Sequence, residues 1–179
     1  MQALRAGVII RRLRALVQNR ETRLEAAEVN ELVNEVLGFL QGDLRHGEVR
    51  VERELDRNLP VVLLDRIQVQ QILLNLIRNA IEAVADRPAA ARMVKVATSS
   101  DGPDRLRIEV CDSGPGVPAE LVERIFDPFC TTKATGTGLG LAISRTIAEA
   151  HQGRLAYEPL PGGGSRFVLQ LPCRRENAQ

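Results

Sequence analysis

The sequence is poor in aromatic residues and carries almost no net charge. Only 3% of its 179 residues are aromatic and none is tryptophan, so it lacks the stacking platforms with which proteins bind single-stranded nucleic acid. A formal net charge of +1 indicates neither a nucleic-acid partner nor a membrane surface. No apolar run approaches membrane-spanning length, and the N-terminus has no signal-peptide core. We therefore expect no membrane contact within this chain.

Cysteine is scarce as well. The chain has three cysteines, Cys111, Cys130 and Cys173, and an odd number cannot all pair in disulfides. Since they also lack the spacing of metal ligands, we interpret them as reduced thiols of a cytoplasmic protein. The parent protein can still have a membrane anchor outside this chain. Hydrophobic residues make up 44% and charged residues 26% of the chain, which is typical of a globular protein. The length suits one domain with an appendage.

The first 22 residues are the expected appendage. An apolar stripe there consists of three pairs seven residues apart, namely Ala6 and Leu13, Ile9 and Leu16, and Ile10 and Val17. This spacing predicts one apolar face on a helix. A single helix of this length cannot bury such a face alone, so we expect a partner helix from another copy or from sequence outside this chain. An ordinary surface helix is the alternative.

The rest of the chain mixes helix and strand patterns. Periodicity and capping signals predict helices over residues 28–40, 65–86, 118–124 and 139–151. Alternating or short apolar runs predict strands over residues 48–56, 59–65, 93–100, 105–112, 154–160 and 166–172. Since the later strands form hairpins, we expect a mixed α+β sheet with helices on one face, a two-layer sandwich.

The helix over residues 65–86 has the strongest signal. Asp65 is its expected N-cap, and Pro88 is expected to close it. In the preceding helix Asn30 is a candidate cap. The side chains expected to point inward from the long helix are Ile67, Ile72, Leu73, Leu76, Ile77, Ala80 and Val84.

A carboxylate followed by bare backbone stands at the end of a predicted strand. The stretch "VCDSGPGVPAE" places Asp112 after an apolar run and follows it with Gly114 and Gly116. Such a carboxylate can accept a hydrogen bond from an exocyclic amine like that of adenine, and the glycines let backbone lie against a base. An Asx turn is the alternative for Asp112 alone.

Two further features suit a bound phosphate and a metal ion. "GTGLGL" (residues 136–141) leads glycine-rich backbone into a helix, where exposed N–H groups and the helix dipole favour an anion; a helix cap on a flexible loop is the alternative. Asn75 and Asn79 are four apart and share a helix face. Their amide oxygens suit Mg²⁺, which prefers few protein oxygens beside phosphate and water; satisfied surface amides are the alternative.

The order of these motifs resembles a known family. Asn75-x-x-x-Asn79, "DSGPGVP", "IFDPFCTTK", "GTGLGLAIS" and "PGGGSRF" resemble the N, first glycine, F, second glycine and third glycine boxes of the catalytic ATP-binding domain of sensor histidine kinases. The resemblance runs from about residue 28 to residue 172, and its details are most similar to the nitrogen-fixation and nitrogen-regulation branch. It implies the Bergerat ATP-binding fold, shared with gyrase, a heat-shock chaperone class and mismatch-repair ATPases.

The resemblance also implies a role for individual residues. Asn79 would ligate Mg²⁺ and Asn75 would lie by the phosphates of ATP. Asp112 would hold the adenine amine, supported by Gly114 and Gly116. The remaining nucleotide contacts that it implies are Phe126 and Phe129 as anchors of an ATP lid, Lys133 facing the phosphates, Gly136, Thr137, Gly138, Leu139 and Gly140 as hinge and backbone donors, and Ser165 in the water network around adenine.

The type of reaction follows from one amide and one missing residue. Hydrolytic members of the superfamily carry a glutamate at the position of Asn75, and an amide cannot act as a general base. The resemblance therefore implies a transferase, with Asn75 and Lys133 in catalytic roles, rather than a strong ATPase. The family's phosphoacceptor histidine has no counterpart here: His46 falls in the predicted polar loop "RHGEV", and His151 ends a helix as a cation on its dipole.

Residues 1–22 then resemble the second helix of the family's dimerisation hairpin, and residues 23–175 its catalytic domain. The implied partners are ATP, a missing phosphoacceptor helix, a response-regulator receiver domain, and a second copy in a homodimer of the full-length protein. Two alternatives stay open. One is an ATP-sensing module or degenerate kinase that transfers nothing. The other is a serine-directed anti-sigma kinase, which would leave the first helix without a role.

Overall fold

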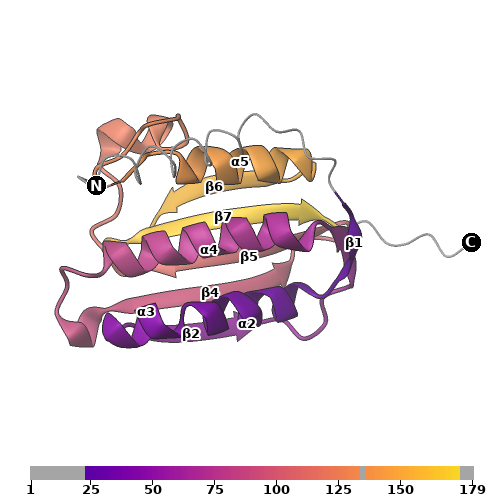
Figure 1. Cartoon of the computed structure of the whole chain (residues 1–179), viewed down its shortest axis with the longest axis horizontal. Coiled ribbons are helices and arrows are strands. Elements are labelled where there is room, and N and C mark those ends of the chain that lie inside the picture. Colours follow the sequence, from indigo (N-terminus) through magenta and orange to yellow (C-terminus); the bar gives the residue numbers. More distant parts are fainter. Residues whose placement is uncertain (1–22, 134–135, 174–179) are drawn as a thin grey trace, which may run out of the picture.

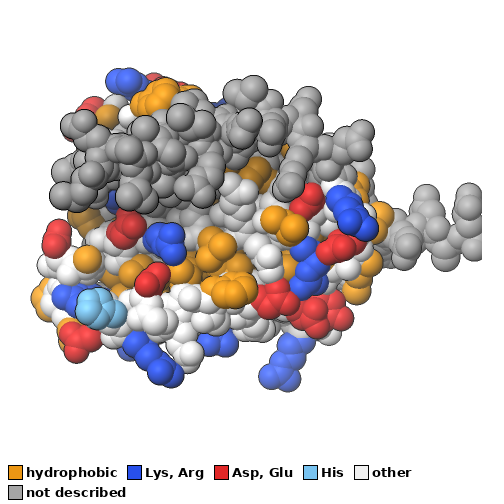
Figure 2. Space-filling model, in the orientation of Figure 1, with side chains coloured by type: hydrophobic (Ala, Val, Ile, Leu, Met, Phe, Trp, Pro, Cys, Tyr) orange, Lys and Arg blue, Asp and Glu red, His pale blue; other side chains and the backbone are white. Residues whose placement is uncertain are grey.

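The computed structural model describes residues 23–133 and 136–173. The helix predicted within residues 1–22 lies outside this part. Among the described helices, none has the length and apolar character that crossing a membrane requires. Acidic and basic side chains are interspersed over the described part of the face in Figure 2, in keeping with the small net charge.

A five-stranded mixed sheet forms one layer of the fold (Figure 1), with the strand order β2-β4-β5-β7-β6. Its strands are β2 (Arg50–Leu55), β4 (Met93–Ser100), β5 (Arg105–Asp112), β6 (Arg154–Pro159) and β7 (Ser165–Pro172). β2 runs parallel to β4, and every other neighbouring pair is antiparallel. The mixed sheet and its two predicted hairpins are therefore confirmed.

Three helices cover one face of this sheet (Figure 1). They are α2 (Val29–Phe39), α4 (Arg66–Ala83) and α5 (Gly140–Ala150), and α4 packs between the other two. Strand residues that alternate inward, such as Val96, Ile108 and Leu169, meet the buried stripe of α4 in one core. This arrangement confirms the expected two-layer sandwich, because each amphipathic element buries its apolar side against the other layer.

Shorter elements complete the chain. A two-stranded antiparallel sheet joins β1 (Glu25–Ala27) to β3 (Val62–Leu64). The remaining elements are α3 (Gln41–His46) and two 3₁₀ turns, η1 (Ala89–Ala91) and η2 (Ala119–Arg124). The sequence pattern did not predict β1 or α3, since three- and six-residue elements show too little periodicity. His46 consequently ends a helix, and its placement in a polar loop is wrong.

Helix α4 begins where predicted, but one of its side chains points the other way. The Asp65 carboxylate accepts a hydrogen bond from Gln68 N–H at 3.1 Å, which confirms the N-cap. The helix ends at Ala83, ahead of Pro88. Ile67 is 70% exposed rather than inward, because it lies one turn before exposed Gln71 and opposite buried Val69.

Asn30 is not a helix cap. Glu28 occupies the N-cap position of α2, and Asn30 lies inside the helix. Its amide nitrogen donates to Asp56 O at 2.7 Å, and its amide oxygen accepts from the Thr98 hydroxyl at 2.8 Å. A local cap preference is overridden here by partners 26 and 68 residues away.

His151 joins the ends of two helices. It is buried, its Nε2 accepts the Asp65 N–H at 3.0 Å, and its Nδ1 lies 2.9 Å from Ile147 O. A ring nitrogen that accepts a backbone N–H carries no proton, so the ring is neutral and Nδ1–H is the donor. The expectation of a cation on the helix dipole is therefore wrong. His151 instead ties the C-terminus of α5 to the N-cap of α4.

Replacing His151 should test this junction. His151→Leu leaves the Asp65 N–H without its acceptor, and we expect the free energy of unfolding to fall by about 1–3 kcal/mol. His151→Gln retains an acceptor oxygen and should lose less. Denaturant unfolding of both variants gives the comparison, and equal losses would show that side-chain volume, rather than the hydrogen bond, is what the junction needs.

Candidate functional site

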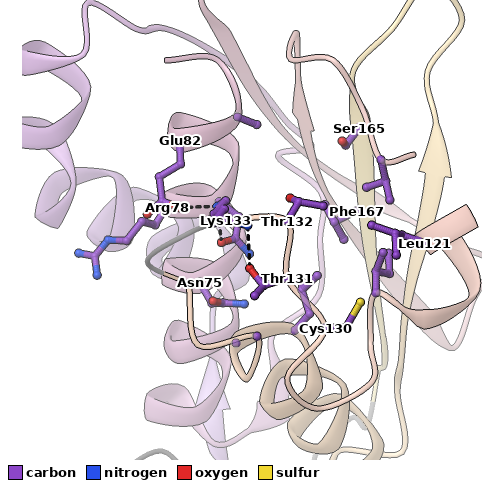
Figure 3. A pocket seen from close by; sticks show the side chains of 18 of the residues that line it. Asn75, Arg78, Glu82, Leu121, Cys130, Thr131, Thr132, Lys133, Ser165 and Phe167 are labelled. Atoms are coloured by element: carbon purple, nitrogen blue, oxygen red, sulfur yellow. Dashed lines mark hydrogen bonds and ion pairs between the residues drawn. The ribbon is translucent and has the colours of Figure 1, made fainter. Parts of the chain in front are cut away.

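A cavity of about 370 Å³ opens between α4, η2, the ends of β5 and β7, and the loop before α5 (Figure 3). Its size falls in the range of small-molecule sites. One end of the cavity is mainly apolar. At the other end, polar side chains of α4 face Thr131, Thr132 and Lys133. The two ends can therefore take an aromatic group and a charged group, respectively.

Asp112 is the buried carboxylate of the apolar end. Its side chain is 4% exposed, beside the cavity-lining residues Val117, Leu121 and Phe167. Its Oδ1 accepts N–H groups of Gly114 at 2.8 Å and Ser165 at 3.3 Å. The bond from Gly114 forms an Asx turn, so the Asx turn that was the alternative to a ligand-binding role is also present. A carboxylate can accept about four hydrogen bonds, which leaves capacity for an amine of a ligand.

The electrostatics of Asp112 are dominated by burial. Desolvation raises the pKa of its carboxyl above the ordinary value. Hydrogen bonds from Gly114 and Ser165, and the charge of Lys133, oppose this shift only in part. A carboxylate held in this state gains from any donor that a ligand brings.

The glycines after Asp112 have different tasks. Gly116 lines the cavity with φ of +81°, a conformation that glycine adopts without strain. Gly114 is not among the lining residues. A Cβ at Gly114 would lie 2.8 Å from Ala83 O of α4, so this glycine serves close packing of β5 against the helix. The expected contact of Gly114 with a base is not supported by this position.

Asn75 and Asn79 both line the polar end, as their spacing predicts. The Asn75 amide nitrogen donates to the Ser144 hydroxyl of α5 at 3.1 Å, which fixes the orientation of the amide. The Asn79 amide oxygen accepts from Lys133 Nζ at 3.4 Å. Lys133 also forms an ion pair with Glu82, shown by dashes in Figure 3. The structure thus brings residues of α4 together with Lys133 and with Ser144 of α5, which are far from α4 in sequence.

The second glycine box packs tightly against its surroundings. Gly136, Thr137, Gly138 and Gly140 line the cavity, whereas the Leu139 side chain is fully buried in the core and leaves only its backbone for a ligand. Gly138 has φ of +65°, and a Cβ there would overlap the Phe129 backbone. A Cβ at Gly140 would overlap the Asn75 amide. Close approach, as much as hinge freedom, therefore requires glycine at these positions.

Adding one methyl group at Gly140 should show this constraint. Gly140→Ala forces the Asn75 amide or the start of α5 to move, and we expect the free energy of unfolding to fall by about 1–3 kcal/mol. Gly38→Ala is a matched control, because Gly38 lies in α2 with no atom within 4 Å of the new Cβ. That change should stabilise the protein by about 0.5–1 kcal/mol. Equal effects of the two changes in denaturant unfolding would contradict the packing argument.

The two phenylalanines expected as anchors differ. Phe126 packs edge-on against Phe167, with ring centroids 6.5 Å apart, and the Arg145 guanidinium lies 5.7 Å from its ring centroid. Phe129 is 63% exposed, and its backbone N–H donates to Gly138 O at 3.0 Å. Phe129 therefore contacts this loop through its backbone, and its role as an anchor of an ATP lid stays a prediction. Neither ring lines the cavity.

Several residues that line the cavity were not predicted from the sequence. Glu82 and Arg78 carry charges at the polar end, while Leu121 and Phe167 form apolar walls. Glu82 follows Asn79 by three residues and so shares its helix face; that spacing was a usable signal. Leu121 and Phe167 carry no chemistry that marks them. Cys130, expected to be a reduced thiol, is a free cysteine that lines the cavity.

The donor set limits how a cation could bind. Among the described residues, no three His, Cys, Asp or Glu side chains group in a way that could hold a metal ion. The oxygens of Asn75 and Asn79 are neutral and few. This chemistry fits Mg²⁺ that arrives with phosphate oxygens, since Mg²⁺ keeps waters and needs one or two protein oxygens. It does not fit a metal bound by the protein alone.

Comparison with known proteins agrees with this geometry. The family model described as histidine kinase-, DNA gyrase B- and HSP90-like ATPase matches residues 64–175. The C4-dicarboxylate transport sensor protein DctS of Rhodobacter capsulatus is 38% identical over 99% of this chain and 27% of DctS. The sensor protein FixL of Bradyrhizobium diazoefficiens is 40% identical over 98% of this chain and 34% of FixL. The chain thus spans about a third or less of these curated relatives.

Solved structures show the same fold. The catalytic domain of the histidine kinase ThkA has a TM-score of 0.74 at 36% identity, over 84% of this chain and 95% of that domain. Full-length ShkA in complex with AMPPNP has a TM-score of 0.81 at 26% identity, over 95% of this chain and 35% of ShkA. ThkA in complex with the response regulator protein TrrA has a TM-score of 0.80 at 29% identity, over 97% of this chain and 48% of ThkA.

The expected Bergerat fold is therefore confirmed. The family model covers more than half of the chain, and the ThkA catalytic domain is matched over nearly its whole length. The chain belongs to the family of histidine kinase-, DNA gyrase B- and HSP90-like ATPases, and within that family to the catalytic domains of histidine kinases.

Proposed function

We propose that this chain binds ATP with Mg²⁺ in the cavity and transfers the γ-phosphoryl group to a histidine of another polypeptide segment, in two-component signalling. One observation carries the proposal. A buried carboxylate, Asp112, lies at the apolar end of a cavity whose other end presents Asn75, Asn79 and Lys133. A purine with an exocyclic amine suits the first end, and a metal-bound triphosphate suits the second.

The chain's own residues have separate tasks in this proposal. Asp112 accepts the adenine amine, while Gly116 and Ser165 complete the wall around the base. Asn79 holds Mg²⁺, which neutralises phosphate charge when bound. Asn75, Lys133 and the backbone of Gly136, Thr137, Gly138, Leu139 and Gly140 orient the phosphates. Phosphoryl transfer depends mainly on such positioning and charge stabilisation.

Asn75 decides between transfer and hydrolysis. Its amide is held by the Ser144 hydroxyl, and an amide cannot take a proton from water. Of the carboxylates among the described lining residues, Asp112 lies at the apolar end, and Glu82 lies beside Asn79 rather than at the position of Asn75. We therefore expect slow ATP hydrolysis by the chain alone. The bond from phosphorus to the β,γ-bridging oxygen breaks as a bond to a histidine nitrogen forms.

The proposed acceptor belongs to the parent protein rather than to this catalytic domain. Buried His151 is engaged at the junction with Asp65, and exposed His46 ends the six-residue helix α3 rather than lying on a helix of a hairpin. We propose that residues 1–22 are the second helix of a dimerisation hairpin and residues 23–175 the catalytic domain. The parent protein is then a homodimer whose first hairpin helix carries the acceptor. We also propose that this catalytic domain lies in the cytoplasm.

A response-regulator receiver domain is the proposed downstream partner. This follows the relationship to ThkA, whose structure with the response regulator protein TrrA matches 97% of this chain. Assignment to the nitrogen-fixation and nitrogen-regulation branch rests on "LLNLIRNAIEA" and "FCTTKATGTGLGLAIS" alone.

Phosphotransfer to a separate helix tests the proposal. The chain is incubated with radiolabelled ATP, Mg²⁺ and a polypeptide that carries a histidine acceptor hairpin. Acid-labile label on the polypeptide, lost when its histidine is replaced, is the expected result. ATP binding without any such label would favour the alternative of an ATP-sensing module, and acid-stable label on serine would favour an anti-sigma kinase. Rapid ATP hydrolysis by the chain alone would contradict the role given to Asn75.

A further inference from the structure

Glu82 lies at the phosphate end of the cavity although it carries the wrong charge for a phosphate site. It lines the cavity one helical turn from Asn79, and its side chain is 47% exposed. Its carboxylate pairs with Lys133, whose ammonium also lies 3.4 Å from the Asn79 amide oxygen (Figure 3). One ammonium group therefore bridges two oxygens of α4.

This contact uses two groups that the proposed function needs elsewhere. Lys133 is proposed to face the phosphates, and the Asn79 oxygen is proposed to ligate Mg²⁺. In the structure the Lys133 ammonium donates a hydrogen bond to the Asn79 amide oxygen and forms an ion pair with Glu82. A nucleotide must therefore draw Lys133 away from Glu82 before both groups can act. Once Lys133 leaves, a carboxylate and an amide oxygen remain side by side on α4.

The consequence differs between metal-free and metal-bound ATP. Metal-free ATP brings close to four negative charges toward an exposed carboxylate and competes with it for Lys133. Metal-bound ATP brings a dication to the oxygens of Asn79 and Glu82 and lowers the repulsion. Arg78, the other cationic side chain among the described lining residues, forms an ion pair with Asp43 of α3 at 3.7 Å.

We propose that Glu82 is a specificity-determining residue that makes nucleotide binding depend on a divalent cation. It holds Lys133 on Asn79 in the nucleotide-free protein and selects metal-bound ATP over metal-free ATP. This inference rests on the proposed function, and it assigns a task to a residue that the proposed function leaves without one.

Glu82→Gln separates the charge of this side chain from its shape. The amide keeps an acceptor oxygen for Lys133 but neither holds it as an ion pair nor repels phosphate. For charges several ångströms apart near a protein surface, we expect metal-free ATP to bind about tenfold more tightly. Metal-bound ATP should change by less than about threefold, because the lost attraction to the dication offsets the release of Lys133. Calorimetric titration with ATP in excess Mg²⁺ and in EDTA measures both.

Glu149→Gln is the matched control. It removes the same charge from an exposed residue of α5 that does not line the cavity, and should leave the ratio of the two affinities unchanged. If Glu82→Gln leaves this ratio unchanged while the unaltered chain binds Mg²⁺-bound ATP, the inference is wrong and the proposed function stands. If the unaltered chain binds ATP under neither condition, the proposed function itself fails.

Discussion

Asp112→Asn is expected to weaken ATP binding by about a hundredfold or more while the protein stays folded. The asparagine oxygen can still accept the N–H groups of Gly114 and Ser165 that Asp112 Oδ1 accepts now. The other side-chain atom becomes an NH₂ group, which meets the adenine amine as donor against donor. Losing a hydrogen bond to a charged group and leaving donors unpaired costs roughly 3 kcal/mol, or two orders of magnitude in affinity.

The same variant should be at least as stable as the unaltered chain. Burial raises the pKa of Asp112 above its ordinary value of 3.8, so ionisation of this group disfavours folding. Its contribution to stability is fully present below the unfolded pKa and is lost as pH rises through the folded pKa. Asparagine does not titrate. The stability of Asp112→Asn relative to the unaltered chain should therefore increase as pH rises from about 3.8 through the raised pKa, and then stay constant.

Two measurements check this expectation. Calorimetric titration gives the affinity for ATP, and denaturant unfolding at acidic and neutral pH gives the stability difference. Asp86→Asn is a suitable control, since it makes the same chemical change at an exposed position after α4. A variant that lost ATP binding only because it had unfolded would leave the role of Asp112 unsupported.

Leu73→Ala should cause a large loss of stability. Leu73 is fully buried at the centre of the helix, in the core that joins the helices to the sheet. Truncating such a side chain removes apolar contact and leaves a cavity, at a cost of about 2–5 kcal/mol. The total free energy of unfolding of a globular domain is about 5–15 kcal/mol. We expect the denaturant concentration at the midpoint of unfolding to fall strongly. The dependence of the unfolding free energy on denaturant concentration should change little.

Ile67→Ala on the same helix provides the comparison. Ile67 is 70% exposed, and surface changes of this kind alter the free energy of unfolding by less than about 0.5 kcal/mol. Both variants lose a branched apolar side chain to alanine, so the difference between them reports burial. Similar losses in the two variants would mean that the inward face of α4 has been assigned incorrectly.

The sequence predicted most of what local physics determines. Asp65 caps α4 because its preference acts over three residues, and the hairpins follow from alternation interrupted by turns. Ile67 was predicted inward because it is apolar, although it lies on the face of Gln71 rather than that of Leu73. Helix geometry could have corrected this prediction.

Other features depend on contacts that no local pattern contains. Asn30 bonds to Asp56 and Thr98 across the fold instead of capping α2. His151 accepts an N–H from a residue 86 positions away, which makes it neutral. At the site, Asp112, Asn75 and Asn79 could be predicted from residue type and spacing, whereas the ion pair of Lys133 with Glu82 depends on how the loop meets α4. Gly114, expected to support the base, does not line the cavity and approaches Ala83 O of α4 instead.

The preference between ATP and GTP tests the central claim most directly. Adenine presents an amine where guanine presents a carbonyl, and an ionised Asp112 can only accept hydrogen bonds. Calorimetric titration of the unaltered chain in excess Mg²⁺ should show ATP binding and GTP binding at least about a hundredfold more weakly, because GTP leaves a buried carboxylate facing a carbonyl. Equal affinities for the two nucleotides would contradict the placement of the base on Asp112.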